Sequence, residues 1–245
     1  MRLAARGPRP RYHAGRGRVA AGEGERVIRA VIFDMDGLMV DSEPVWGASW
    51  APALALHGLE EAPGLAQACR GSSRAAVTAR VAEFYGPDVD ATAIVEDFFA
   101  IAQATLMDEG APKKPGLDEL LAWLGAHEVP CAVASSSPYE LICSELARAG
   151  VLDKVAYAIS GNGGALPSKP APDIFWAAAE GIGADPASTL VLEDSVNGAR
   201  AGVAGGFVTV MVPDLQEPTD DLRAGCARIC ADLLEVRDLL AAGAL

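Results

Sequence analysis

Short apolar runs alternate with longer segments of mixed apolar and polar residues along most of the chain. The apolar runs are rich in β-branched residues and occupy residues 27–33, 129–134, 155–160, 189–192 and 207–212. Each run is short enough for a buried strand. The segments between them have the apolar spacing of helices and cover residues 116–127, 138–149, 172–181 and 196–204. The alternation predicts βαβ units, and therefore an α/β fold with a Rossmann-like parallel sheet between two layers of helices.

One segment interrupts this alternation directly after the first apolar run. Residues 42–111 contain no convincing strand, and helical stretches are predicted at residues 44–57, 73–85 and 91–108. We therefore expect a core formed by residues 27–41 and 112–245, with an all-helical cap domain inserted at residues 42–111. A domain inserted there lies over the carboxyl ends of the strands, where open α/β sheets bind their ligands.

The first 26 residues differ from the rest of the chain in composition and charge. They are rich in Arg, Gly and Ala without a hydrophobic period, so we expect a disordered, Arg-rich extension. This segment carries a net charge of +5, whereas residues 27–245 carry −18. Such an acidic body repels the phosphates of DNA and RNA, which argues against a nucleic-acid partner. If the protein binds a phosphate group, it must therefore do so with a few positively charged groups concentrated at one site.

The content of apolar residues and the number and spacing of the cysteines exclude further classes of protein. Hydrophobic residues make up 51% of the 245 residues, which is enough for a sizeable core and argues against wholesale disorder. No stretch approaches the roughly 18 uninterrupted apolar residues of a membrane-spanning helix. The five cysteines are odd in number and never spaced C-x-x-C, which argues against a disulfide framework. We expect a cytoplasmic monomer that acts on a small molecule and binds no membrane.

Four groups of polar residues fall at or just past predicted strand ends or helix starts. They are F-D-M-D-G with Asp34 and Asp36, A-S-S-S with Ser135 first among its serines, S-K-P with Lys169, and L-E-D-S with Glu193 and Asp194. Four converging carboxylates repel one another unless a cation offsets their charge. Mg²⁺ prefers oxygen ligands and suits a phosphate site, so the sequence predicts a magnesium-assisted phosphate chemistry at this edge of the sheet.

These residue types can divide the work of a phosphoryl transfer. With the metal bound, one carboxylate can attack phosphorus and form an aspartyl-phosphate. Lys169 and the Ser135 hydroxyl can neutralise and hydrogen-bond the phosphoryl oxygens. Asp36 follows Asp34 by two residues and lies on the same side of an extended chain, so it can protonate the leaving alkoxide and then deprotonate water.

Each group also has a purely structural interpretation. Asp-Gly is a common turn sequence, which would account for Asp36 without chemistry. Ser136 and Ser137 compete with Ser135 for helix capping and for ligand binding, and Ser137 with Glu140 fits a capping box that places Pro138 at the first helical position. Glu193 and Asp194 could stabilise a helix N-terminus.

Taken in order, the four groups resemble the motifs of the haloacid dehalogenase (HAD) superfamily, in the subfamily with a helical cap after the first strand. The resemblance covers residues 27 to about 240. It implies that Asp34 is the nucleophile and a metal ligand, and that Asp36 is the acid/base whose backbone carbonyl also binds Mg²⁺. It further implies phosphate binding by Ser135 and Lys169. Asp194 then matches the distal metal ligand, with Glu193 as its acidic companion.

Within the superfamily, three longer segments are most similar to bacterial sugar-phosphate phosphatases, such as hexitol and 2-deoxyglucose-6-phosphate phosphatases, and to β-phosphoglucomutase. The segments are D-M-D-G-L-M-V-D-S-E-P-V-W, S-K-P-A-P-D-I-F and L-E-D-S-V-N-G. The cap sequence R-G-S-S-R also contains the G-x-S-R pattern through which the mutase binds a second phosphate. This resemblance makes Arg74 a candidate for contact with a distal anionic group; a solvated arginine at a helix start is the alternative.

The resemblance predicts a Mg²⁺-dependent phosphatase of small phosphorylated metabolites, with sugar or polyol phosphates as the expected class. A phosphomutase of the β-phosphoglucomutase type is the first alternative, although Trp46 stands where that enzyme carries a cap-hinge histidine. The second alternative is a non-catalytic phospho-acceptor module, similar to a response-regulator receiver. The inserted segment of roughly 70 residues argues against a receiver, and so does Asp36, because a receiver needs neither a cap nor an acid/base.

Overall fold

The predicted parallel sheet is confirmed in the computed structural model, which describes residues 27–70, 72 and 74–245. The predicted extension at residues 1–26 lies outside the described residues. Six strands form one sheet in the order β3-β2-β1-β4-β5-β6, with every neighbouring pair parallel. The strands are β1 (Ala30–Phe33), β2 (Cys131–Ser135), β3 (Tyr157–Ser160), β4 (Thr189–Glu193), β5 (Val208–Met211) and β6 (Arg228–Ile229).

Helices cover both faces of the sheet, because alternate strand residues point to opposite sides. Val31 and Phe33 of β1 pack in one hydrophobic cluster with three helices: α6 (Leu117–Ala126), α7 (Tyr139–Arg148) and α11 (Leu233–Ala241). Ile32, between them, packs on the other face with α8 (Asp173–Gly181) and α9 (Val196–Ala204). A further short helix, α10 (Asp220–Gly225), packs against α9.

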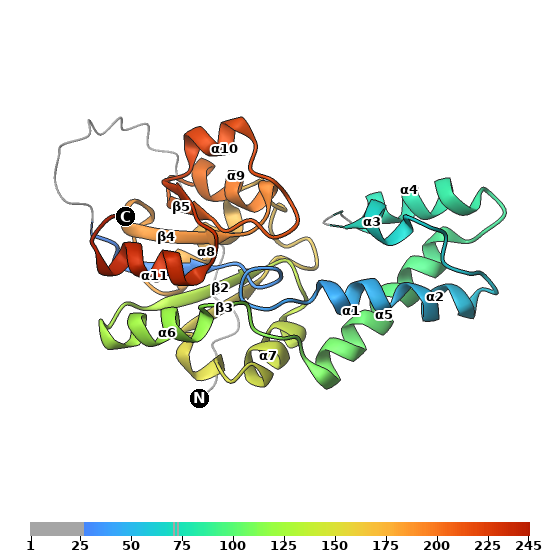
Figure 1. Cartoon of the computed structure of the whole chain (residues 1–245), viewed down its shortest axis with the longest axis horizontal. Coiled ribbons are helices and arrows are strands. Elements are labelled where there is room, and N and C mark those ends of the chain that lie inside the picture. Colours follow the sequence, from blue (N-terminus) through green and yellow to red (C-terminus); the bar gives the residue numbers. More distant parts are fainter. Residues whose placement is uncertain (1–26, 71, 73) are drawn as a thin grey trace.

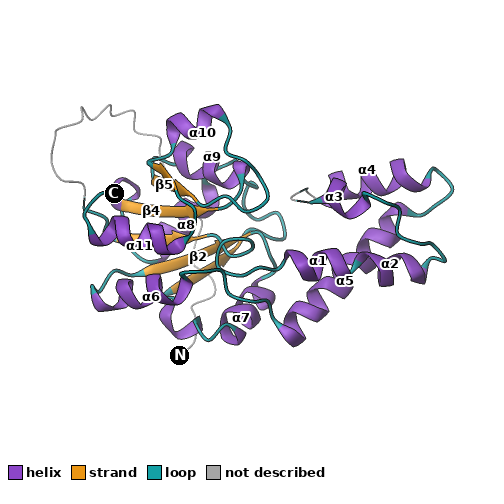
Figure 2. Cartoon of the chain, viewed as in Figure 1, coloured by secondary structure: helices purple, strands orange, loops and turns teal. Residues whose placement is uncertain are grey.

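Five helices after β1 extend away from the sheet to one side (Figure 1, Figure 2). They are α1 (Glu43–Ala48), α2 (Trp50–Leu56), α3 (Leu65–Cys69), α4 (Arg74–Tyr85) and α5 (Ala91–Glu109). They have their own hydrophobic cluster, in which the rings of Trp50 and Phe98 stack with their centroids 3.8 Å apart. We propose residues 42–111 as the cap domain. None of the helices within the described ranges has the length and apolar character needed to cross a membrane.

The two chain segments that join these helices to the sheet lie side by side. The backbone N–H of Asp41, on the outgoing segment, donates to the carbonyl of Pro112 on the returning segment (2.8 Å). Val40 forms an antiparallel bridge with Lys113, and the N–H of Lys114 donates to the carbonyl of Met39 (2.9 Å). The outgoing and returning segments are therefore bonded to each other.

Several local features differ from the sequence-based expectations. The helical stretch predicted at residues 44–57 is divided at Ser49, because Pro52 has no N–H to donate to the Ala48 carbonyl. The capping box predicted at Ser137 is wrong: α7 begins at Tyr139 with Pro138 as its N-cap, and the Ser137 hydroxyl donates to Asp36 instead. Among the α-helices and strands, α3, α10, β6 and α11 were not predicted. The first three are short, whereas α11 has the apolar spacing of a helix.

Glu145 is an ionisable residue on the buried face of α7. It is 1% exposed, and neither carboxylate oxygen has a hydrogen-bond partner among the described residues. Burial raises the pKa of Glu145 to about 8, and the Asp36 carboxylate adds to this shift. Because the folded-state pKa lies above the usual value, the stability that this group contributes is complete in acid and is lost as pH rises through about 8.

We therefore expect Glu145→Gln to raise the free energy of unfolding at pH 9 by about 1–3 kcal/mol, because the neutral amide avoids the cost of holding an ionisable carboxyl in the core at this pH. At pH 5 the variant and the wild type should differ little, because the folded wild type is already protonated at this position. Urea unfolding at both pH values measures the effect, with Glu140→Gln on the exposed face of the same helix as the control. Identical pH dependence in wild type and Glu145→Gln would contradict the expectation.

Candidate active site

The carboxyl ends of three neighbouring strands bring the predicted polar residues to one edge of the sheet. Asp34 directly follows β1, Ser135 ends β2 and Glu193 ends β4. The register pairs Phe33 with Val133 on one side and with Leu192 on the other, and the Asp34 N–H donates to the Leu192 carbonyl (3.0 Å). The residues that follow these three strands therefore emerge beside one another.

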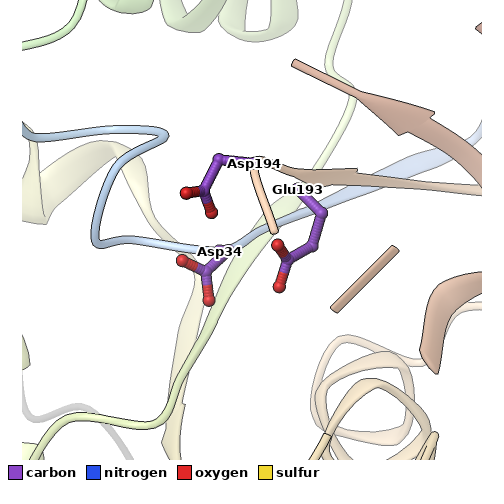
Figure 3. A group of neighbouring side chains, drawn as sticks. All are labelled: Asp34, Glu193 and Asp194. Carbon is purple, nitrogen blue, oxygen red and sulfur yellow. The ribbon is translucent and has the colours of Figure 1, made fainter. Parts of the chain in front are cut away.

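Three carboxylates meet at this edge, as Figure 3 shows. Asp34, Glu193 and Asp194 each place a carboxylate oxygen within 4.8 Å of the others. Asp34 is 7% exposed and Glu193 is 1% exposed, so water screens their charges poorly. Asp34 and Asp194, far apart in the sequence, are thus close enough to share one cation.

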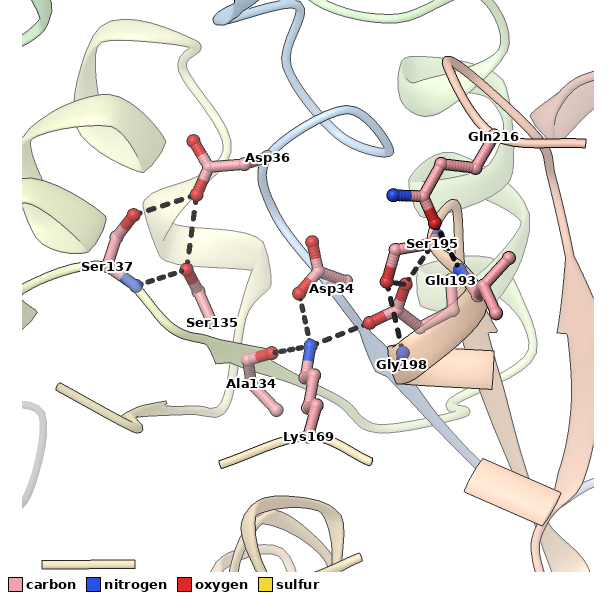
Figure 4. Close-up of polar contacts among 11 residues, drawn as sticks. Asp34, Asp36, Ala134, Ser135, Ser137, Lys169, Glu193, Ser195, Gly198 and Gln216 are labelled. Carbon is pink, nitrogen blue, oxygen red and sulfur yellow. Dashed lines mark hydrogen bonds and ion pairs between the residues drawn. The ribbon is translucent and has the colours of Figure 1, made fainter. Parts of the chain in front are cut away.

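Lys169 lies between two of these carboxylates (Figure 4). Its Nζ donates to Asp34 Oδ1 (2.5 Å) and Glu193 Oε1 (2.7 Å), and to the Ala134 carbonyl (3.2 Å). Burial alone would lower the pKa of Lys169, but the charges of Asp34 and Glu193 reverse this effect and raise the pKa above its ordinary value. Lys169 therefore stays protonated, and its ammonium group is aimed at the Asp34 carboxylate.

Glu193 is held by contacts on both of its oxygens. Oε1 accepts from Lys169, while Oε2 accepts from the backbone N–H (2.8 Å) and the hydroxyl (2.9 Å) of Ser195. The Ser195 hydroxyl in turn caps α9 by accepting from the Gly198 N–H (3.0 Å). A Cβ at Gly198 would lie 1.6 Å from Glu193 Oε1, so only glycine leaves room for this carboxylate. Through its two carboxylate oxygens, Glu193 therefore holds both the Lys169 ammonium group and the first turn of α9 in place.

The charges of this cluster are not balanced by Lys169 alone. Burial raises the pKa of Asp34 to about 7, and the neighbouring Glu193 and Asp36 add to the shift while Lys169 opposes it. Burial and the Glu193 charge raise the pKa of Asp194 to about 9. A bound cation would stabilise the ionised form of these carboxylates. A site made only of oxygen donors fits a hard divalent ion such as Mg²⁺.

The Asp36 side chain lies apart from the three clustered carboxylates and is held by serines (Figure 4). Its Oδ1 accepts from the Ser42 hydroxyl (2.9 Å), and its Oδ2 accepts from the hydroxyls of Ser137 (2.8 Å) and Ser135 (3.3 Å). Ser135 thus contacts Asp36, and its oxygen also accepts from the Ser137 N–H (3.0 Å). The contacts of Ser42 and Ser137 with Asp36 were not predicted, because a hydrogen bond between side chains leaves no mark in the pattern of apolar and polar positions.

A cavity of about 510 Å³ opens over these residues, between the sheet edge and helices α1–α5. Asp34, Asp36, Lys169 and Asp194 line its polar side. The opposite wall contains the aromatic rings of Trp46 and Phe99, packed edge to face with their centroids 5.3 Å apart. The cavity is therefore polar at the carboxylates and largely apolar at the helices.

Arg74 lies on this helical wall. Its guanidinium carbon is 4.1 Å from the centre of the Phe99 ring, which is a cation–π contact, and its side chain lines the cavity. Arg70 lines the same cavity 3.8 Å from the carboxylate of Glu43. Phe99, Arg70 and Glu43 were not predicted as cavity residues, because no motif marks a contact between separate helices.

Comparison with known proteins gives the family. Residues 28–206 match the family described as haloacid dehalogenase-like hydrolase. The chain is 31% identical to hexitol phosphatase B of Escherichia coli over 80% of this chain and 88% of that protein. It is 27% identical to the bifunctional riboflavin kinase/FMN phosphatase of Arabidopsis thaliana over 87% of this chain, but spans only 55% of that longer protein.

A solved structure extends the likeness to three dimensions. It is a HAD family hydrolase from Deinococcus radiodurans with bound phosphate and sodium, 30% identical, with a TM-score of 0.70 over 89% of this chain and 97% of that chain. The family match covers most of the described residues and includes all four polar groups around the cavity. The chain therefore belongs to the haloacid dehalogenase-like hydrolase family, and the sequence-based expectation of an enzyme of this family is confirmed.

Proposed function

We propose that the protein is a Mg²⁺-dependent phosphatase that hydrolyses small phosphorylated metabolites, with sugar or polyol phosphates as the substrate class. The observation that carries this proposal is the placement of Asp34. Its carboxylate contacts the buried ammonium group of Lys169, lies beside Asp194 and opens into a cavity large enough for a small ester. A nucleophile, a phosphate-binding cation and a candidate metal site thus share one edge of the sheet.

The metal would be held by Asp34, Asp194 and the backbone carbonyl of Asp36, with Glu193 behind Lys169. Bound there, Mg²⁺ would offset the negative charge on the phosphoryl oxygens and on the attacking carboxylate. The remaining work falls to side chains of the chain itself. Lys169 binds a phosphoryl oxygen and keeps it beside Asp34. The Ser135 hydroxyl, which donates to Asp36 in this structure, would turn toward the phosphate to donate a second hydrogen bond.

The reaction then proceeds in two steps with Asp36 as the proton carrier. A carboxylate oxygen of Asp34 attacks phosphorus as the bond to the ester oxygen breaks, and Asp36 gives its proton to the leaving alkoxide. In the second step Asp36 takes a proton from water, which attacks the phosphorus of the aspartyl-phosphate and frees Asp34. The hydroxyls of Ser42 and Ser137, 2.9 and 2.8 Å from the Asp36 carboxylate, fix its direction throughout.

The side chains on the helical wall of the cavity are suited to contact a substrate of the size of a small metabolite. Trp46 and Phe99 offer flat apolar surfaces to the carbon skeleton of an ester, and Arg74 on Phe99 offers a charge to a distal anionic group. Trp46 occupies the position of the mutase's cap-hinge histidine, which favours hydrolysis over return of the phosphoryl group to a sugar. A relative at 31% identity is named hexitol phosphatase B, and a hexitol is a polyol.

Phosphate release from a panel of sugar, polyol and nucleoside monophosphates, with and without Mg²⁺, tests this proposal. We expect turnover that requires the metal and is fastest with a sugar or polyol ester. An isomerised sugar that forms only with a bisphosphate activator would identify a phosphomutase instead. A long-lived phosphoprotein without turnover would identify a phospho-acceptor module.

Metal binding should also change stability in a pH-dependent manner. In metal-free protein the folded-state pKa values of Asp34 and Asp194 are raised, so the stability they contribute is complete in acid and is lost as pH rises through about 7 and about 9. Mg²⁺ offsets this loss. We expect Mg²⁺ at a hundred times its Kd to add about 2.7 kcal/mol at pH 8.

The same Mg²⁺ concentration should add less at pH 6, where protons compete for the carboxylates. Thermal unfolding with Mg²⁺ or EDTA at both pH values measures the difference, and Na₂SO₄ of matched ionic strength controls for screening. A Mg²⁺ effect that is equal at pH 6 and pH 8 would contradict this account.

A further inference from the structure

Asp214, in the loop after β5, forms a largely buried ion pair outside the four predicted groups. Its Oδ1 accepts from Lys114 Nζ at 2.7 Å, and the two side chains are 18% and 22% exposed. Lys114 lies on the segment that returns from α5 to α6 and is fixed there by its backbone bond to Met39. One oxygen of Asp214 is therefore held in place from a neighbouring part of the fold.

The other oxygen of Asp214 has no such partner. Asp214 Oδ2 is buried and accepts no hydrogen bond from any described residue. A buried carboxylate oxygen without a donor is costly, and such groups generally bind something else, such as ordered water or an ion. The ion pair therefore leaves Asp214 with one buried acceptor oxygen for which the described residues supply no donor.

Gly37 shows which groups surround this oxygen. A Cβ at Gly37, whose φ is +83°, would lie 2.5 Å from Asp194 Oδ2 and 3.4 Å from Asp214 Oδ2, so both carboxylates pack closely against this backbone. The two carboxylate oxygens thus approach the same point beside the Gly37 backbone. One of them belongs to a proposed metal ligand, so the unpartnered oxygen of Asp214 lies at the margin of the proposed metal site.

We propose that Asp214 is a positioning residue that accepts a hydrogen bond from a water molecule bound to Mg²⁺. The inference rests on the proposed function, because it concerns the same metal. Mg²⁺ gives up its water reluctantly and keeps several water ligands in protein sites, and each of these needs acceptors beyond the metal. Asp214 Oδ2 supplies such an acceptor, and Lys114 fixes its direction through Oδ1.

This role extends the metal site to the segment that returns from the helices. Acceptors that orient the ligands of a metal commonly change its affinity by 10- to 100-fold when they are lost. A carboxylate that served only its ion pair with Lys114 would leave Mg²⁺ affinity unchanged when replaced by an amide of the same shape. Metal affinity therefore separates the positioning role from a structural one.

The test is calorimetric titration of Mg²⁺ into the full chain at pH 8 without substrate, comparing wild type, Asp214→Asn and Glu43→Gln. Asp214→Asn keeps an oxygen for Lys114 and turns a donor toward Gly37, so we expect its Mg²⁺ Kd to rise at least about tenfold. Glu43→Gln removes an equal charge from a residue that lines the cavity but is not among the groups nearest to Gly37, and we expect a change of about twofold or less.

The possible results separate this inference from the proposed function. Equal Kd values for wild type and Asp214→Asn, or equal losses in Asp214→Asn and Glu43→Gln, would overturn the role of Asp214 and leave the metal site standing. A wild-type protein that does not bind Mg²⁺ would overturn the proposed function, and the inference with it. Thermal unfolding without Mg²⁺ checks the fold, and Asp214→Ala provides a second variant in which the same loss of affinity is expected.

Discussion

The Asp34→Asn variant should release phosphate at least about 10⁴-fold more slowly than the wild type, because the neutral amide is a far weaker nucleophile toward phosphorus than the carboxylate. The contact with Lys169 orients the carboxylate but cannot replace it. Phosphate release under saturating Mg²⁺ and substrate measures the loss. Asp118→Asn, which alters an exposed ion pair with Lys113, is the matched control and should retain full activity.

The same variant separates lost chemistry from lost folding. Burial raises the pKa of Asp34 to about 7, so asparagine resembles the protonated form of this residue. We expect the metal-free variant to be at least as stable as the wild type at pH 8. Rapid quenching with acid, followed by mass spectrometry of peptides containing residue 34, should detect a phosphorylated peptide only in the wild type. Undiminished turnover by Asp34→Asn would reject the proposed nucleophile.

Replacement of Lys169 by methionine should have the largest effect on stability. The change removes the ammonium group that contacts Asp34 and Glu193 and leaves two buried carboxylates facing each other. Breaking a buried pair by removal of one partner costs about 3–5 kcal/mol, so we expect a loss of this size at pH 8 in urea unfolding without metal. Phosphate release should fall as well, since the variant lacks the ammonium group that we propose binds a phosphoryl oxygen.

An exposed ion pair provides the comparison for this result. Lys113→Met breaks the contact with Asp118 at the surface, where such pairs contribute about 0–1 kcal/mol. The deficit of Lys169→Met should shrink at pH 5, because Asp34 then carries a proton and the repulsion disappears. Equal losses in the two variants, or a deficit that does not depend on pH, would show that Lys169 does not balance these charges.

The sheet and the polar residues at its edge follow from local patterns. Each buried strand is an apolar run, and the residues that interrupt its end, such as Asp34 after Phe33, must lie at the carboxyl edge of a parallel sheet. The meeting of Asp34 with Asp194 was therefore predictable from strand ends alone. The roles of these residues in catalysis remain predictions until the variants are measured.

Contacts between side chains from separate segments could not be predicted in this way. Ser137 was expected to cap α7, but Pro138 is the N-cap residue of that helix, and the Ser137 hydroxyl donates to the carboxylate of Asp36 from another segment. The Lys114–Asp214 pair joins residues that share no motif. Such contacts depend on how loops pack, which has no period in the sequence.

The paired segments at residues 39–41 and 112–114 have a mechanical consequence. The outgoing and returning segments are bonded to each other, and the end of α5 is also bonded to α7, where the Met107 carbonyl accepts from Ser144 (3.2 Å) and Arg148 (2.7 Å), so the five helices are anchored to the core at both places. Ser42 directly follows the outgoing segment, and its hydroxyl holds Asp36. Asp36, which we propose as the proton carrier, is thus held beside this anchorage, where a movement of the helices would displace atoms less than it would at Arg74.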